Sequence, residues 1–97
     1  MSVRTEELVN SIVHQLQIPE EDLVSQSLRL WLENQLRTIK AEIFEVTGRY
    51  GVSGVEEMDA RYRDGTLEEA GSWRDFQRLD HLEYHRDRLA DLIESIK

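Results

Sequence analysis

Two histidines, His81 and His85, stand four residues apart, a spacing that places both imidazoles on one face of a helix. Paired imidazoles at this spacing can ligate a divalent metal. In the zinc-protease motif a glutamate directly follows the first histidine, whereas this chain has Leu82 there. Glu42 and Glu45, one helical turn apart, supply carboxylates on another segment. A metal-dependent helical enzyme using these four residues is an alternative hypothesis, but the pattern favours two exposed histidines and no metal or other cofactor.

Other residue types that take part in catalysis follow no pattern that a reaction requires. Gly48, Gly51 and Gly54 lack the lysine and hydroxyl residue that end a phosphate-binding loop, and they are typical of a helix end and a turn. No histidine neighbours Ser53 or Ser72, so nucleophilic catalysis has no visible support. The sequence therefore predicts a protein that is not an enzyme.

Composition narrows the classes of partner. The 97 residues suffice for one domain with a modest core, and the formal net charge is −8. This acidity disfavours nucleic acid, whose backbone is bound mainly by Lys and Arg, and it suits a basic protein partner. The chain has no cysteine, no apolar run approaching the ~20 residues that span a bilayer, and no apolar signal core at its start. We expect a cytoplasmic protein without disulfides or membrane association.

A long apolar stripe between Leu28 and Tyr50 organises the rest of the chain. Its residues recur at alternating steps of four and three, which is the seam of a helix that packs on another helix. They are Leu32, Leu36, Ile39, Ile43, Val46 and Tyr50. Pro19 fits the first position of this helix and Gly51 fits its left-handed end, so the pattern predicts one helix over residues 19–50.

The other helices follow from apolar spacing and from residues that favour helix ends. An apolar stripe predicts an N-terminal helix within residues 1–18, with Ser2 or Thr5 as its cap. Two capping-box patterns, beginning at Ser53 and Thr66, predict a short helical connector over residues 53–70. A final stripe predicts a C-terminal helix over residues 72–97.

No stretch alternates with a period of two, so no sheet is expected. The sequence thus predicts a single all-α domain over residues 1–97. Its core is a long antiparallel helical hairpin with a short bridging helix, and an N-terminal helix packs on the hairpin or on a second subunit.

Trp31 is the most informative residue for binding. It stands between Leu30 and Leu32, and one partner helix cannot bury three successive bulky side chains that point around the helix. The N-terminal helix, a second subunit or another protein must cover the remaining side, and tryptophan is favoured at binding hot spots. We therefore expect a homo-oligomer. The predicted partner or oligomer interface comprises Leu28, Trp31, Leu32, Leu36, Ile39, Ile43 and Trp73.

Residues 28 to 92 resemble a loose group of small prokaryotic helical proteins that look like antitoxins of toxin–antitoxin pairs. The likeness is carried by Tyr50-Gly51-Val52-Ser53, Val55-Glu56-Glu57, Asp64-Gly65, Trp73-Arg74-Asp75 and Leu79-Asp80. The resemblance implies a non-enzymatic protein–protein interaction module, with a basic partner such as a nuclease toxin.

Two segments are also similar to the helical part of ribbon-helix-helix antitoxins. They are Ile18-Pro19-Glu20-Glu21 and the stretch from Ser25 to Glu33. In that family an N-terminal basic strand reads DNA, and here only Met1 to Arg4 precede the first helix. Because so few residues precede the first helix, the resemblance implies the protein-binding half of an antitoxin. A ribbon-helix-helix-like transcription regulator is a further alternative.

Overall fold

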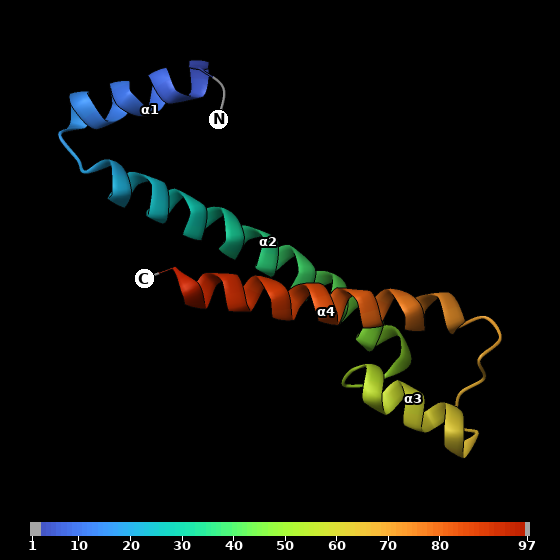
Figure 1. Ribbon diagram of the computed structural model, residues 1–97. Coiled ribbons are helices and arrows are strands. Elements are labelled where there is room, and N and C mark those ends of the chain that lie inside the picture. The colour runs from blue at the N-terminus through green and yellow to red at the C-terminus, as the bar shows by residue number, and fades with distance from the viewer. Residues whose placement is uncertain (1–2, 97) are drawn as a thin grey trace.

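Helices α2 and α4 form a long antiparallel hairpin to which two shorter helices are attached (Figure 1). The computed structural model describes residues 3–96, and Met1, Ser2 and Lys97 lie outside the described residues. Within this range the helices are α1 (Val3–Leu16), α2 (Glu20–Tyr50), α3 (Val55–Asp64) and α4 (Trp73–Ser95), and there is no strand. The all-α class and the bridged antiparallel hairpin are thereby confirmed.

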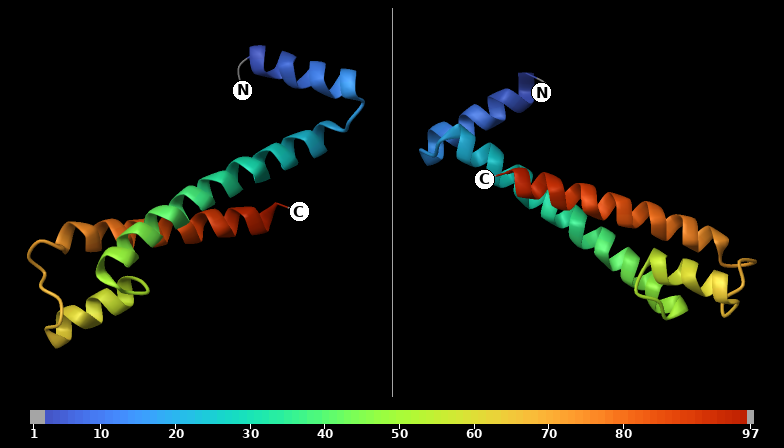
Figure 2. Two further views of the ribbon diagram at one scale, coloured as in Figure 1. Left: turned by 180° about the vertical axis from the view of Figure 1, so that it is seen from behind. Right: turned by 60° about the horizontal axis from the view of Figure 1, so that its bottom comes forward.

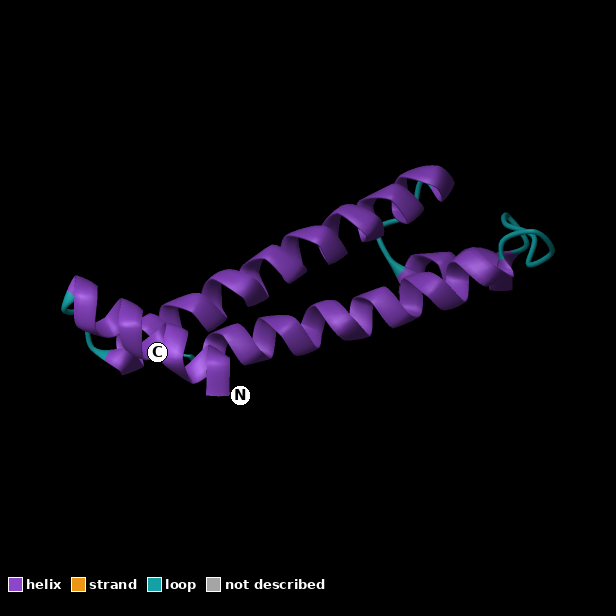
Figure 3. Cartoon of the chain, turned by 90° about the horizontal axis from the view of Figure 1, so that it is seen from above, coloured by secondary structure: helices purple, strands orange, loops and turns teal. Residues whose placement is uncertain are grey.

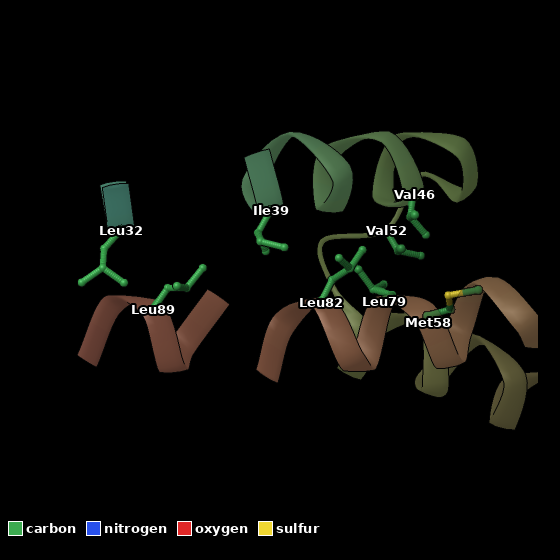
Figure 4. Packing of buried hydrophobic residues seen from close by; sticks show 8 residues of the cluster. All are labelled: Leu32, Ile39, Val46, Val52, Met58, Leu79, Leu82 and Leu89. Carbon is green, nitrogen blue, oxygen red and sulfur yellow. The ribbon is translucent and has the colours of Figure 1, made fainter. Parts of the chain in front are cut away.

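The hairpin is a rod, and its core is a single file of side chains between α2 and α4. The principal extents are 62 × 24 × 17 Å, and short loops join the helices (Figure 3). Apolar side chains of α2 and α4 face one another along the seam (Figure 4). Val52 and Met58 of the connector join them near Val46 and Leu79. The buried set is Leu32, Ile39, Val46, Val52, Met58, Leu79, Leu82 and Leu89. The apolar stripe of the sequence is thus the seam on which α4 packs.

The ends of the long helix lie close to where proline and glycine indicate them. Pro19 is the N-cap of α2, with φ −63° and ψ 138°, and not its first helical residue as expected. Its extended ψ lets its carbonyl accept from the N–H of Leu23 at 3.1 Å. Gly51 is the C-cap, with φ 63°, a left-handed conformation that glycine adopts without steric penalty.

Both capping-box predictions in the connector were wrong in detail. The N-cap of α3 is Gly54, and the N–H of Ser53 donates to the Glu57 carboxylate at 3.0 Å, so Glu56 is not its partner. Residues 66–69 form no helical turn. The Asp64 carboxylate instead accepts from both the N–H and the hydroxyl of Thr66, at 2.9 and 2.6 Å, and this local bonding competes with a helix.

Helix α1 folds back over the start of α2 and lies away from α4 (Figure 2). Gln17 takes a left-handed conformation, φ 52°, and with Pro19 it turns the chain between the two helices. No α1 residue from Val3 to Leu16 is buried. Thr5 lies inside α1 and is not its cap, while Ser2, the other expected cap, is outside the described residues. Among residues 3–96, no helix has the length and apolarity needed to cross a bilayer.

Candidate protein-binding surface

The predicted interface residues divide between the hairpin seam and the outer surface. Leu32 and Ile39 are buried under α4, and Leu36 and Ile43 are half-buried against the same core. These four side chains are therefore covered by the chain's own C-terminal helix. They stabilise the hairpin and leave little surface for a second molecule.

Leu28 and Trp31 remain 51% and 59% exposed, because α1 covers them only partly. They lie in an open hollow of about 400 Å³ between α1 and the start of α2. Helix α1 contributes Thr5, Leu8, Val9 and Ile12, and α2 contributes Leu23, Val24, Ser27, Leu28 and Trp31. No charged residue is among these nine. We call residues 3–31, which carry this hollow, the apolar arm.

The apolar surface continues from the arm toward the end of α4. A second hollow of about 360 Å³ shares Val24 and Leu28 with the first and reaches Ile96. The guanidinium of Arg29 donates to the carbonyl oxygen of Ile96 and so holds the end of α4 beside α2. Leu28 therefore lies between two adjoining hollows, and Glu20, Glu21 and Ser25 also line the second one.

Trp73 lies at the other end of the rod, so the structure does not bring the two tryptophans together. It is 46% exposed, and its ring stacks on Phe76 with centroids 5.1 Å apart. Tyr62 packs against both rings and joins α3 to the start of α4. The Tyr62 hydroxyl also hydrogen-bonds the buried Ser72 hydroxyl at 2.7 Å. These contacts give Trp73 a role in fastening the connector.

A polar network crosses from α2 to α4 near Trp73. The carboxylate of Asp75 accepts from the Tyr50 hydroxyl and, at 2.7 Å, from Arg49, which also pairs with Glu45 at 3.1 Å. The bond from Tyr50, with a further contribution from Arg49, holds the pKa of Asp75 below its ordinary value of 3.8. The same bond raises the pKa of the Tyr50 phenol above 10.0. This network fixes the register of the two long helices.

Side chains from neighbouring helices cap the connector and the end of α2. The Arg61 guanidinium on α3 donates to the carbonyls of Tyr50 and Gly51, at 3.1 and 3.0 Å. The Glu83 carboxylate on α4 accepts from the N–H of Val55 at 2.8 Å. Both contacts satisfy backbone groups that a helix end leaves unpaired.

The residues of the metal hypothesis do not form a cluster. His81 and His85 are exposed on α4, with ring centroids 6.4 Å apart. Glu45 is paired with Arg49, and Glu42 lies half-buried on α2. Across residues 3–96 no group of three or more His, Asp or Glu side chains is placed to hold a metal ion.

Sequence reasoning named Leu28 and Trp31 but missed the residues of α1 and of early α2 that share their surface. Leu8, Ile12 and Val24 complete the hollow. The signal was present, because the α1 stripe is as apolar as a buried helix face. The stripe was expected to pack on the hairpin or on a second subunit, and in the structure α1 is only partly covered, with Val9, Ile12 and Val13 half-buried.

The fold and this surface define a class: an elongated helical-hairpin protein with a partly uncovered apolar arm. The chain belongs to the uncharacterized protein MJ0235 family, whose model matches residues 1–97. No curated protein and no solved structure matches the chain.

Proposed function

We propose that this chain is a non-enzymatic protein-interaction module that binds a partner protein through the apolar arm. The observation that carries the proposal is the exposure of Leu28 and Trp31 inside a hollow whose lining has no charged residue. Contiguous apolar surface of this kind marks protein-binding sites, and a tryptophan within it is a typical hot spot.

Covering this surface would contribute favourably to the free energy of binding, against the cost of association. Covering the exposed parts of Leu28 and Trp31 removes on the order of 200 Å² of apolar area from water. At about 25 cal/mol per Å² this contributes roughly 5 kcal/mol. The neighbouring apolar side chains of the hollow add to that figure.

A site-specific photo-cross-linker tests the proposal in the native cell. We expect a benzophenone side chain in place of Leu28 to form adducts with a partner protein. A matched probe in place of Lys40, which is exposed on α2 outside the hollow, is the control. Adducts specific to position 28 support the proposal. Their absence, or equal adducts at both positions, contradicts it.

A second candidate function concerns the opposite end, where acidic charge is concentrated. Residues 53–72 contain six acidic residues and two arginines, which is half of the net charge of −8. Arg61 and Arg63 face Glu57 and Asp59 of their own helix at 3.9 and 3.3 Å. The remaining acidic charge supports the antitoxin hypothesis, in which this end masks a basic toxin.

Co-expression with the product of the adjacent gene tests the antitoxin hypothesis. Growth arrest caused by that product should be relieved by the wild-type chain. Relief should be lost when Glu56, Glu68 and Glu69 are replaced by glutamine. No arrest, or full relief by the substituted chain, counts against the hypothesis.

A further inference from the structure

The lining of the hollow restricts what can occupy it. Its side chains are apolar except for the hydroxyls of Thr5 and Ser27, so the surface offers no charge to a charged ligand. The two helices that flank the hollow, α1 and the start of α2, run antiparallel and are splayed apart (Figures 1 and 2). An apolar helical face is therefore the complementary surface.

We propose that the occupant is the apolar arm of a second copy of this chain, so that two arms pack as an intermolecular four-helix bundle. Each copy contributes α1 and the start of α2, and a two-fold axis relates them, so the same patch serves on both sides. This inference rests on the proposed binding role of the arm and names its partner.

The surface area of one copy agrees with this arrangement. A folded monomer of 11.4 kDa is expected to expose roughly 5,800 Å². This chain exposes 7459 Å², an excess of about 1,700 Å². A stable interface of ordinary size buries about 800 Å² on each partner, and an obligate dimer buries more. The excess of the whole rod exceeds the area that such an interface buries, and the arm carries seven of its exposed large apolar side chains: Val3, Leu8, Leu16, Val24, Leu28, Leu30 and Trp31.

Helix α1 supports the same inference from its own stability. It has 14 residues, and none of them is buried within one copy. Isolated helices of about that length are marginal in water, so a helix in this position needs tertiary contacts on its apolar face. The left-handed Gln17 and the extended Pro19 direct that face toward the hollow of its own chain. A second arm placed there packs on α1 and α2 together.

Charge distinguishes a second copy from a basic partner. The arm carries five acidic residues and two arginines between positions 3 and 31, and all seven are exposed. Two arms therefore repel each other weakly at their rims, and salt screens this repulsion. Association of two copies should strengthen as salt rises, whereas binding of a basic protein should weaken.

Sedimentation equilibrium of the purified full chain tests the dimer. We expect a mass of about twice 11.4 kDa, and a dissociation constant that falls at least about twofold between roughly 20 and 500 mM salt. Leu28→Glu and Trp31→Glu each place an unpaired charge in the interface and should raise the dissociation constant about 100-fold or more. Phe44→Glu is the matched control, because Phe44 is 78% exposed on α2 outside the hollow, and it should leave the mass unchanged.

Spin labels give a second readout that needs no destabilising substitution. The chain has no cysteine, so Asn10→Cys and Arg63→Cys each provide a single labelling position. A dimer joined through its arms should give a measurable dipolar distance for label 10 and a much longer one, or none, for label 63.

Several results would overturn the dimer: a wild-type monomer at high concentration, a dimer unaffected by either glutamate, or a short distance at label 63 alone. The proposed binding role of the arm can stand or fail independently of the dimer. If the chain is monomeric but the probe at position 28 captures a different protein, the dimer fails and the proposed function stands. If neither association occurs, both fail.

Discussion

The carboxylate of Glu83 on α4 caps the first residue of α3, accepting a hydrogen bond from the N–H of Val55 at 2.8 Å. The N-cap of α3 is Gly54, which has no side chain to serve this purpose. A residue 28 positions further along the chain therefore satisfies the start of the short helix. The connector therefore depends on α4 both for the cap at the start of α3 and for its packing.

Glu83→Ala should lower the free energy of unfolding by about 1 kcal/mol, because the N–H of Val55 loses its acceptor. Glu83→Gln keeps an acceptor oxygen and should lose less. Urea denaturation measures both, and Glu94→Ala, at an exposed position on the same helix, is the control. Equal effects of the two alanine substitutions would show that the cap contributes nothing.

Gly54→Ala examines the same contact from the other side. A Cβ at position 54 would lie 2.9 Å from the Glu83 carboxylate oxygen and would push the cap aside. The substitution should therefore destabilise the wild-type chain more than the Glu83→Ala chain. Additive losses of stability in this double-mutant cycle would show that residues 54 and 83 do not interact.

Stability should fall in acid partly through Asp75. Its pKa is depressed in the folded state, chiefly by the bond from Tyr50, so its contribution is present above the unfolded value near 3.8. That contribution is lost as the pH falls through the lower, folded pKa. Asp75→Asn should flatten the pH dependence of the free energy of unfolding below about pH 5. Denaturation over this range measures it, and an unchanged slope would contradict the assignment.

Alanine should change the stability with opposite signs at Gly48, in the last turn of α2, and at Gly51, its C-cap. Gly51 has φ 63°, so Gly51→Ala should cost about 1 kcal/mol of stability although a Cβ there meets no atom within 4 Å. Gly48 is helical and exposed, also with nothing within 4 Å, so Gly48→Ala should add up to about 1 kcal/mol. Thermal unfolding distinguishes these signs, and a loss at both positions would show that Gly48 has a further role.

Replacement by alanine should lower the stability strongly at Leu79, on the seam, and only slightly at Leu92. Leu79 is fully buried, so Leu79→Ala should remove about 2–5 kcal/mol. Leu92 lies on the same helix with half of its surface exposed, and its replacement by alanine should cost less than about 1 kcal/mol. Chemical denaturation compares them, and similar losses would contradict the placement of the core on the seam.

Removal of residues 1–17 should leave the hairpin folded, because α1 buries none of its residues 3–16. Circular dichroism should show the helical content of α2, α3 and α4. Amide exchange should still protect Val46 and Leu79, which are fully buried. Loss of that protection would assign to α1 a part in the hairpin core.

The long elements were predictable because their signals are local. Pro19 and Gly51 delimit the helix expected over 19–50, which the structure places at Glu20–Tyr50. The turn expected to be helical at 66–69 failed because the Asp64 side chain bonds Thr66 locally, and this competition leaves no mark in apolar spacing.

Contacts that depend on the register of the helices could not be read from the sequence. Asp75 has the appearance of an ordinary first-turn acid, and only the antiparallel pairing brings it to Tyr50. The surface at Trp31 was half predicted. The bulky run around this residue indicated that it needs a cover, but the angle of α1 decides that Leu8 and Val24 share the same hollow.

The apolar arm and the acid-rich connector lie at opposite ends of a rod 62 Å long (Figure 1). In the proposed dimer the two connectors therefore point away from the joined arms. Such a molecule is bivalent: one assembly presents two identical acidic heads at a fixed spacing. It would engage a paired basic target with avidity, and would bridge two separate ones, without any change in the affinity of a single head.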